Sequence, residues 1–596
     1  DTYIDGIRVR GSANLPNAAI EQVSVITGGM PAEYGDATGG IVSITTRGAS
    51  KDWFGGLEYL TSGFKNGDKV IGLDSYGYNL LGFNLAGPIF TRKDSAGNKT
   101  DAIAGFFISG EYKNELDYRP SAIDNYKVNN EKMDELNKNP LIRRTDDIGG
   151  VINQASYLKA SDLETIKYRQ NANRKGLNLA GKIDISPTKN TTITLGGTFD
   201  YEDRNRAEGS GLIRSYSLLN SDNNPQFIDR SWRTYARFTQ RFDNNEDKDN
   251  PSLIKNAFIS LQADYSNVLN KIQDEEHKDN FANYGYIGKY TSTRQNTYNT
   301  GRFTSIDANG NPVDTLFGLL STNEVVAYQF QRDEINPILA NYVDNYYQIF
   351  ANDQAGYWER PSQVQGNGGL LNGDAPSSIY NLWSAQGGQY NQYQITNQDQ
   401  LRITTSGSAE IKGHSIKIGF QYEQRAISQY NISPRGLWTL GRGLVNTHLD
   451  NRNVTEGSYT TDTLTNSSGG SIVQYTFQPF YGENQTQFDK NIRQKLGLAQ
   501  QGLDYIDFDS YGNGLWSISD FTADDLLNSY AQNQINYYGY DYTGKKLSGN
   551  PSLDDFFTKK DANGNLLREQ GAFRPIYMAG YIQDKFAFED LIFNIG

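Results

Sequence analysis

The run GLNLAGKIDISPTKNTTITLGGTFDY, residues 176–201, decides how this chain folds. Apolar residues occupy alternate positions in both halves of the run, and polar residues lie between them. The apolar set is Leu177, Leu179, Ile183, Ile185, Ile193, Leu195, Phe199 and Tyr201; the polar set is Asn178, Lys182, Asp184, Thr194, Thr198 and Asp200. Successive side chains of a strand point to opposite faces. Because only 186–190 separate the halves, the run predicts an antiparallel hairpin with one apolar and one polar face.

The same alternation recurs along the chain and predicts about eleven strands of the length that a tilted membrane strand requires. The other segments lie near 53–64, 76–87, 102–113, 230–242, 259–265, 402–411, 416–423, 574–587 and 591–596. Short links at 186–190, 243–253, 412–414 and 588–591 alternate with long ones at 114–173, 204–229, 269–397 and 429–573. Membrane barrels have short turns at one rim and long loops at the other. We therefore predict an all-β fold, a large antiparallel transmembrane β-barrel, with the long links as extracellular loops.

Composition excludes several other classes of protein. The formal net charge of -13 disfavours a nucleic-acid partner, which a basic face would attract. The chain has no cysteine, so it holds neither a disulfide framework nor a thiolate metal site. No apolar run approaches the roughly 20 residues that a spanning helix needs. Since Asp1 is preceded by neither Met nor a signal-like segment, we expect the natural N-terminus to lie upstream.

No pattern indicates catalysis, a metal or a cofactor. Near-matches to a phosphate loop lack the Ser or Thr that binds magnesium, and no GxSxG run occurs. His277, His414 and His448 lack the spacing of metal ligands, and we expect them in surface loops. We therefore predict that the protein is not an enzyme.

The long links are too long to be structureless, so we expect them to fold over the barrel mouth. Two patterns predict short helices within them. Ser161 to Glu164 has the spacing of a capping box, and Thr522 to Asp525 has a similar spacing before Leu526.

The first fifty residues differ from the rest of the chain. They contain YIDGIRVRG at 3–11 and LPNAAIEQVSVITGGMPAEYGDATGGIVSITTRG at 15–48. The alternating pairs Val23, Val25 and Val42, Ile44 predict two buried strands, with a glycine-rich reversal between them. The run resembles the end of the plug domain in TonB-dependent outer-membrane receptors. The plug-signature residues are Glu21, Gly28, Tyr34, Gly35, Gly39 and Gly40, beside Ile20, Val23, Val25, Val42, Ile44 and Thr45.

This resemblance implies that 1–50 form the C-terminal part of a plug domain inside a barrel of about 22 strands when complete. It also implies that 51–596, with about eleven strands, form the N-terminal half of that barrel. It implies a location in the outer membrane of a Gram-negative bacterium, in contact with outer-membrane lipids. It further implies import of a peptide or protein, a siderophore or a glycan. The TonB-ExbB-ExbD system would drive import through a segment that precedes the chain.

Two runs narrow the resemblance to receptors of the Bacteroidota. They are GGMPAEYGDATGG at 28–40, which is similar to the Oar-like, carboxypeptidase-regulatory-like branch, and YIQDKF at 581–586. Gly29, Met30 and Pro31 stand where SusC glycan importers usually carry Lys-Asp-Ala. This departure weakens a polysaccharide assignment.

The segment from Asn341 to Gln398 is rich in aromatic and amide side chains, which can hold sugars, peptides or siderophores. The candidates for a substrate-binding loop are Tyr346, Tyr347, Tyr357, Trp358, Trp383, Tyr390 and Tyr393. Alternatively, these residues pack a large loop against its neighbours. Inward-facing charges could line a path, brace the plug or simply face a solvated lumen. They are Glu111, Asp184, Asp200, Asp264 and Glu410.

The leading hypothesis is an import channel. The second is a non-transporting barrel subunit or scaffold of an outer-membrane assembly or secretion complex with surface lipoproteins. A third, a secreted soluble β-rich adhesin, would stay in solution without detergent. The alternation of short and long links argues against the third.

Overall fold

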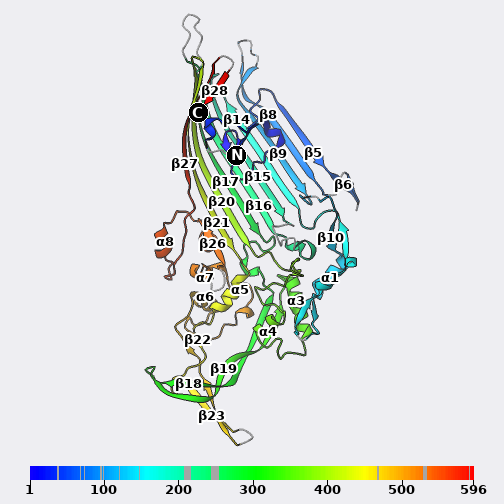
Figure 1. The fold of residues 1–596 in the computed structure, drawn as a ribbon, viewed down its shortest axis with the longest axis vertical. Helices are drawn as coiled ribbons and strands as arrows, with labels where there is room; N and C mark the ends of the chain where they lie inside the picture. Colours follow the sequence, from blue (N-terminus) through cyan, green and yellow to red (C-terminus); the bar gives the residue numbers. More distant parts are fainter. Residues whose placement is uncertain are drawn as a thin grey trace.

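The computed structural model describes residues 1–35, 39–67, 69–72, 74, 76–93, 95, 97, 99–119, 121–146, 148–206, 216–242, 254–465, 469–527, 533–588 and 591–596. Strands make up nearly half of the described chain, and one large sheet dominates it (Figure 1). No helix among these residues has the length and apolar composition needed to cross a membrane.

The large sheet has twelve strands, of which eleven follow one antiparallel path. In order they are β5 (Phe54–Thr61), β8 (Asn79–Lys93), β9 (Lys99–Glu115), β14 (Arg174–Ile185), β15 (Thr191–Asn205), β16 (Gln226–Phe242), β17 (Ile254–Gln273), β20 (Tyr393–Ile411), β21 (His414–Ile432), β27 (Ile576–Phe588) and β28 (Leu591–Ile595). The twelfth, β26 (Ile535–Tyr538), pairs with the end of β21. Each segment that the sequence predicted as a strand overlaps one of the eleven. Closure of the barrel and the total of about 22 strands stay predictions.

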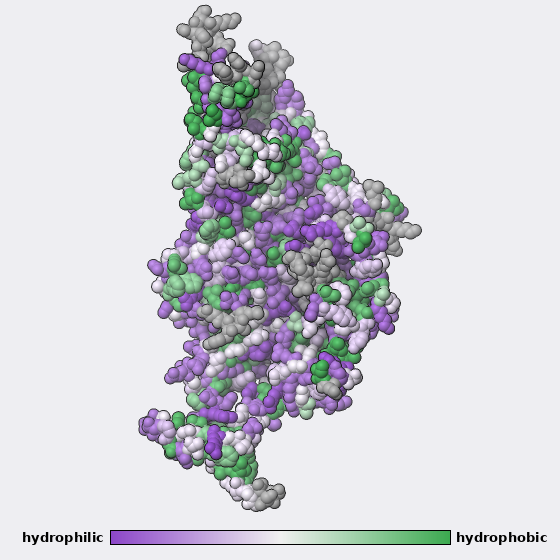
Figure 2. All heavy atoms as spheres, in the orientation of Figure 1, coloured by the Kyte–Doolittle hydropathy of each residue, from purple (hydrophilic) through white to green (hydrophobic). Residues whose placement is uncertain are grey.

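The two faces of this sheet differ in chemistry. The register aligns Ile183 with Leu195 on one face, and both are exposed. On β20, Leu401 and Ile403 are 42% and 41% exposed, whereas Arg402 between them is 1% exposed. The predicted alternation is therefore confirmed here. We call the face of Leu401 the outer face and that of Arg402 the inner face. In the view of Figure 2, hydrophilic residues cover the middle of the molecule, and hydrophobic residues gather near β27 and β28.

Short and long connections lie at opposite ends of the strands (Figure 1). Residues 186–190 join β14 to β15, and 412–413 join β20 to β21, as predicted. The predicted link 243–253 and residues 589–590 of the link 588–591 lie outside the described residues, as do 207–215 of the loop 204–229.

The long connections hold α1 (Asn130–Lys138), α2 (Tyr216–Leu219), α3 (Pro337–Ile349), α4 (Pro361–Gly366), α5 (Gly436–Leu444), α6 (Gln487–Leu496), α7 (Ala523–Leu527) and α8 (Leu553–Thr558). Small sheets join β6 (Gly63–Asn66) to β7 (Lys69–Gly72), β10 (Asn125–Val128) to β13 (Leu163–Ile166), β11 (Leu141–Arg143) to β12 (Val151–Asn153), and β22 (Leu449–Asp450) to β25 (Phe480–Tyr481). The long hairpin β18 (Gly288–Ile306) and β19 (Pro312–Arg332) pairs with β24 (Ser471–Phe477), which also pairs with β23 (Tyr459–Thr465). Short 3-10 turns include η3 (Gln154–Tyr157), η4 (Ala160–Asp162), η6 (Ser221–Asn223), η7 (Phe281–Asn283), η8 (Phe508–Ser510) and η9 (Ile518–Asp520).

One of the two predicted loop helices is confirmed and the other is wrong. The Thr522 hydroxyl accepts a hydrogen bond from the Asp525 amide at 3.1 Å, and α7 begins at Ala523. After Ser161, in contrast, the chain ends a 3-10 turn at Asp162 and enters β13. Pairing of β13 with β10 overrides the local capping signal there.

The described residues of 1–35 and 39–46 contain a separate four-stranded sheet, the N-terminal sheet, in the order β2-β1-β4-β3. Its strands are β1 (Thr2–Ile4), β2 (Ile7–Arg8), β3 (Ile20–Ile26) and β4 (Ile41–Thr46), with η1 (Asn17–Ala19) and η2 (Ala32–Tyr34) between them. Buried Ile4, Leu15 and Ala19 pack against Ala86, Phe107 and Ala180 of the large sheet.

The prediction that both valines of β3 are buried is wrong. Val23 and Val25 are exposed because β3 is the outer strand, bonded to β4 alone. Ile41 of β4 is buried, whereas Val42 and Ile44 are half-buried. The alternating pattern therefore identified the strands but not which of them would be covered.

Candidate functional site

The turn between β1 and β2, Asp5 and Gly6, is the centre of the contact between the two sheets. Both residues have positive φ angles, 50° and 78°, which an Asp-Gly pair tolerates in a two-residue turn. The buried Asp5 carboxylate accepts bonds from the Thr46 amide at 3.0 Å and hydroxyl at 2.6 Å. It also accepts bonds from Lys182 Nζ at 3.3 Å and the Tyr235 hydroxyl at 3.0 Å. Asp5 thereby links the N-terminal sheet to β14 and β16.

Three arginines of the inner face donate hydrogen bonds to backbone carbonyls of the N-terminal segment. Arg402 Nη2 bonds the Gly6 carbonyl at 3.0 Å, and Arg233 Nη2 bonds the Ser12 carbonyl at 2.6 Å. Arg237 donates to the Asp5 carbonyl. These bonds fasten the segment through its backbone.

Most of the predicted inward-facing charges support this contact. Glu111 accepts from the Asn17 amide at 2.5 Å, and Asp184 accepts from the Ala49 amide at 2.9 Å. Asp200 accepts from Asn14 Nδ2 at 3.3 Å. Asp264 acts indirectly, through its ion pair with Arg402 at 3.0 Å.

Glu410 does not join them, because it accepts a bond from Asn256 within the large sheet at 2.8 Å. Of the predicted alternatives, bracing of the N-terminal segment therefore fits the contacts of the other four carboxylates. Solvation of the inner face fits Glu410 alone.

A cavity of about 430 Å³ lies between the N-terminal sheet and strands β16 to β27. Its wall on the large sheet is rich in hydroxyl and amide groups: Thr239, Ser260, Gln262, Thr404, Ser406 and Gln421. Glu33 and Lys417 also line it and form an ion pair at 2.5 Å. Beside them, Gln583 of β27 accepts a bond from the Ala32 amide at 2.8 Å. Polar groups therefore surround a space that runs alongside the N-terminal sheet.

The plug-signature residues have different surroundings. The ring of Tyr34 packs edge-on against Tyr3 with centroids 4.9 Å apart. Gly40 has a φ of +101°, and a Cβ there would lie 3.1 Å from the Ile26 carbonyl oxygen, so glycine suits this position. Exposed Glu21 lies at a register shift between β3 and β4.

The remaining signature glycines show no such local requirement. Gly28 and Gly39 have open surroundings, and Gly35 has an ordinary right-handed conformation. Residues 36–38, inside the run 28–40, lie outside the described residues. The signature as a whole stays a prediction.

The seven aromatic residues predicted as a substrate-binding loop do not gather in one place. Tyr346, Tyr347, Tyr357 and Trp358 belong to one apolar cluster, Trp383 to a second and Tyr393 to a third. The Tyr390 hydroxyl donates to Gln392 at 2.7 Å.

Several polar atoms of this aromatic set bond to the loop's own backbone. Tyr346 donates to the Tyr357 carbonyl at 2.8 Å, and Tyr347 donates to the Tyr328 carbonyl at 2.6 Å. Trp358 Nε1 bonds the Phe350 carbonyl at 3.0 Å. These contacts favour the packing alternative, and a binding role stays a prediction.

Two histidines correct the expectation of surface positions. His277 and His448 are buried, whereas His414 is exposed. His277 Nε2 lies 2.7 Å from Asn336 Oδ1, and His448 Nδ1 lies 3.5 Å from Asp489 Oδ2. Both are covered because the long connections build an apolar core of their own around Trp438 and Phe488.

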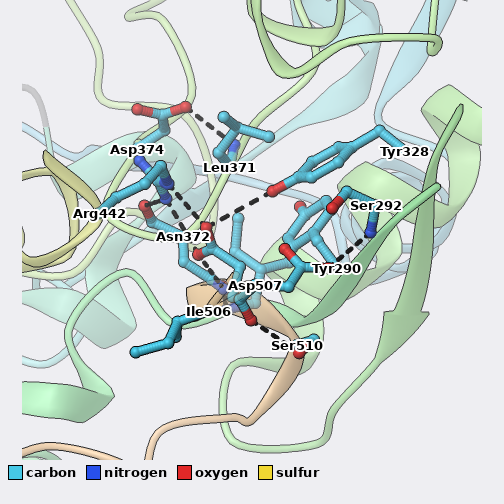
Figure 3. A network of polar contacts seen from close by, with 12 residues as sticks. Tyr290, Ser292, Tyr328, Leu371, Asn372, Asp374, Arg442, Ile506, Asp507 and Ser510 are labelled. Carbon is cyan, nitrogen blue, oxygen red and sulfur yellow. Dashed lines mark hydrogen bonds and ion pairs between the residues drawn. The ribbon is translucent and has the colours of Figure 1, made fainter. Parts of the chain in front are cut away.

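A buried polar network joins the two longest connections, 274–392 and 433–575 (Figure 3). Arg442 binds Asp509 twice, Nε to Oδ2 at 2.6 Å and Nη2 to Oδ1 at 3.0 Å. Asn372 Nδ2 donates to the same carboxylate at 3.0 Å, and Arg442 Nη2 also donates to the Asn372 carbonyl at 3.0 Å. We call these three residues the loop clasp. No local sequence pattern marks them.

Electrostatics explains why the loop clasp stays charged. Burial alone lowers the pKa of Arg442, but the Asp509 carboxylate raises it above its ordinary value, so the guanidinium remains protonated. Burial raises the pKa of the neighbouring Tyr328 well above its ordinary range, so its hydroxyl stays neutral. That hydroxyl lies 3.5 Å from Asp509 Oδ2. The loop clasp is therefore a charge-assisted, bidentate contact.

No family model matches the chain. No curated protein matches it either. Among solved structures, the siderophore receptor PiuA from Acinetobacter baumannii matches with 13% identity and a TM-score of 0.29, over 72% of this chain and 51% of that one.

Two structures from Escherichia coli also match. The outer membrane transporter YddB has 9% identity and a TM-score of 0.30, over 79% of this chain and 43% of that one. The ferric-catecholate import receptor Fiu has 11% identity and a TM-score of 0.28, over 80% and 58%. The chain thus spans about half the length of these proteins. Likeness of this size does not identify a family, so assignment rests on the chain's own geometry.

Proposed function

We propose that this chain is part of an outer-membrane importer of the TonB-dependent receptor type. Residues 1–50 would be the C-terminal part of its plug, and 51–596 would be the first half of its barrel. The observation that carries the proposal is the division of the large sheet into an exposed apolar face and a polar face that holds the N-terminal sheet. A sheet surrounded by water covers its apolar face, whereas a sheet in lipid exposes it.

Exposed apolar residues on many strands support the proposal that the outer face contacts lipid. Exposed apolar residues of neighbouring strands lie in register, such as Ile183 beside Leu195 and Phe238 beside Leu261. β5 and β28 are the two end strands of the described sheet, and each pairs with one neighbour, so both ends of the sheet are open edges. Since unpaired backbone is costly in lipid, we propose that further strands close the sheet into a barrel.

The contacts of the inner face support the proposal that the N-terminal sheet is a plug that can shift. Single hydrogen bonds from several strands hold the N-terminal sheet, and a polar cavity lies beside it. Water can replace such bonds one at a time as the sheet moves. In the proposal, the TonB-ExbB-ExbD system drives this movement through a segment that precedes Asp1.

The first test is conductance of the full-length protein in planar lipid bilayers bathed in potassium chloride. The intact protein is expected to conduct little, and deletion of 1–50 is expected to open a large, stable conductance. A deletion variant that inserts but stays closed would contradict a plugged channel. A protein that remains in solution without detergent would contradict the membrane assignment itself.

The second test separates an importer from a static scaffold. Thr46→Cys places a thiol at a buried position of the contact, and the chain has no other cysteine. Labelling by fluorescein maleimide is expected to be several-fold faster in cells with TonB than in cells without it. Gln22→Cys, at an exposed position, is the control and should label equally in both. Equal, slow labelling of Thr46→Cys in both strains would favour the scaffold.

A further inference from the structure

A second, larger cavity lies among the long connections, away from the N-terminal sheet. Its volume of about 510 Å³ falls within the range of small-molecule pockets. One wall comes from β12 and η3, and the other comes from α3, α4 and residues 368–379. None of the seven aromatic residues predicted as a substrate-binding loop lines it.

The lining is mostly polar, with some aliphatic side chains, and carries almost no charge. It includes Asn153, Ser156, Gln365, Ser377 and Ser378. Asp374 is the one charged side chain among the described residues that line the cavity. Because this lining offers no lysine, arginine or histidine, an anionic ligand such as a phosphate or an iron chelate finds no cationic partner.

Asp374 is held in place by the surrounding fold. Its Oδ2 accepts bonds from Gln365 Nε2 at 2.8 Å and from the Leu371 amide at 2.8 Å. Figure 3 shows Asp374 at the edge of the polar network, near Asn372 and Arg442. Asn372 of the loop clasp thus holds the segment that carries the Asp374 carboxylate.

Two tyrosines expose their rings directly beside the lining residues. Tyr157 follows Ser156 and is 61% exposed; Tyr380 follows Ile379 and is 63% exposed. The Tyr380 hydroxyl donates to the Ser156 carbonyl, so this side chain spans the two walls.

The backbone that carries Tyr380 is unusual. Tyr380 and Asn381 have φ angles of +53° and +56°, a left-handed conformation that is uncommon for a bulky residue such as tyrosine. Such conformations persist where surrounding contacts enforce them, and they gather at binding sites. Here the conformation holds an exposed ring at the rim of the cavity.

We propose that this cavity binds a neutral carbohydrate. The apolar face of a pyranose ring would lie on Tyr380 or Tyr157, and its hydroxyls would pair with Asp374 and the amide and hydroxyl groups of the lining. The carbohydrate would be the substrate of the importer proposed above. Its transport rests on that proposed function, whereas its binding in the cavity does not.

The cavity fits a peptide less well. An extended peptide needs a free strand edge with a run of backbone donors and acceptors. β12 pairs with β11 on one side, and its Val151 amide bonds the Asn367 carbonyl. On the opposite wall, Pro376 interrupts the segment 374–378 because it lacks an amide hydrogen.

The experiment uses the full-length protein purified in detergent and a printed array of oligosaccharides. The neutral arm holds glucans, mannans, galactans and xylans, and the acidic arm holds hyaluronan and heparin fragments. A tryptic peptide mixture is the third arm. Binding of at least one neutral glycan is expected, and titration calorimetry then gives its Kd.

Variants test whether the cavity is the site. Tyr380→Gly removes the ring and suits the positive φ angle, and Asp374→Asn removes the charge with little change of shape. Each is expected to weaken glycan binding at least tenfold. Tyr126→Ala, which removes another exposed loop tyrosine outside the lining, should leave the Kd unchanged.

The inference is overturned if no neutral glycan binds, if only acidic glycans or peptides bind, or if both cavity variants bind like the original protein. Glycan binding without TonB-dependent labelling of Thr46→Cys would uphold the carbohydrate site and contradict import. The two proposals can therefore fail separately.

Discussion

The contact between the N-terminal sheet and the inner face differs in kind from the contact between the two longest connections. The first has an apolar cluster of six buried residues, three of them alanine. The second lies in a cluster of twenty buried residues that includes Trp438, Trp516 and Phe488. Both contain buried charges, but the second cluster holds many aromatic rings, whereas the first holds Phe107 alone.

This difference fits the proposal that the N-terminal sheet moves and the loop core does not. Apolar burial contributes roughly 25 cal/mol per Å² and is lost only when surfaces separate. Hydrogen bonds to a backbone carbonyl can be exchanged for bonds to water, with a net cost of about 1 kcal/mol each. In the proposal, the loop core therefore stays folded during transport, whereas the N-terminal sheet is fastened by bonds that water can replace.

The largest expected effect comes from breaking the loop clasp. Arg442→Met leaves the Asp509 carboxylate buried without its cation, which costs about 3–5 kcal/mol. We expect the long connections to become sensitive to trypsin at temperatures where the original protein resists. Limited proteolysis with mass spectrometry would locate the cuts between 274 and 392 and between 433 and 575.

A double variant separates lost charge from lost packing. In Arg442→Met/Asp509→Leu no buried charge is left unpaired, so most of the lost protease resistance should return. If Arg442→Met alone were as resistant as the original protein, the loop clasp would not stabilise the connections.

A smaller effect is expected from Asp5→Ala, which removes the acceptor shared by Thr46, Lys182 and Tyr235. Loss of these charge-assisted bonds at a buried site weakens the contact between the N-terminal sheet and the large sheet by about 2–3 kcal/mol. Amide hydrogen exchange in β1, β2 and β4 should rise by at least tenfold, while exchange in β14 and β15 stays slow.

Asp1→Ala is the matched control, because Asp1 pairs with Arg8 at 2.8 Å within the same sheet and is partly exposed. It should leave exchange nearly unchanged. Equal exchange in Asp5→Ala and in the original protein would show that the Asp5 turn does not hold the sheet.

The smallest effect is expected from Lys417→Met, which removes the ion pair with Glu33. Both side chains are about 30% exposed, and such pairs contribute roughly 0.2–1 kcal/mol. Stability should hardly change, but exchange at Ala32 and Glu33 should lose its dependence on salt concentration. A loss of stability as large as that of Asp5→Ala would place the main contact at η2 instead.

The sequence predicted the large sheet well because a period of two is a local signal that each strand carries by itself. It identified Glu111, Asp184 and Asp200 as inward-facing for the same reason. It failed for Val23 and Val25, since burial of an alternating strand depends on which neighbour covers it.

The contacts within the long connections could not be predicted from a local pattern. Arg442 and Asp509 are 67 positions apart, and Asn372 and Asp509 are 137 apart, so no spacing rule connects them. The buried positions of His277 and His448 likewise depend on a core assembled from distant segments. The larger cavity also differs from the sequence expectation, because Gly29, Met30 and Pro31 weakened a glycan assignment while its lining favours one.

The most direct test of the membrane assignment is a spin-label scan of β20. The chain has no cysteine, so single cysteines at Leu401, Ile403, Thr404 and Ser406 can each carry one label in lipid bilayers. Labels at 401 and 403 should collide preferentially with oxygen, which dissolves in lipid, and labels at 404 and 406 with a water-soluble nickel chelate. Equal accessibility at all four positions, or the reverse alternation, would contradict a sheet with lipid on its outer face and water on its inner face.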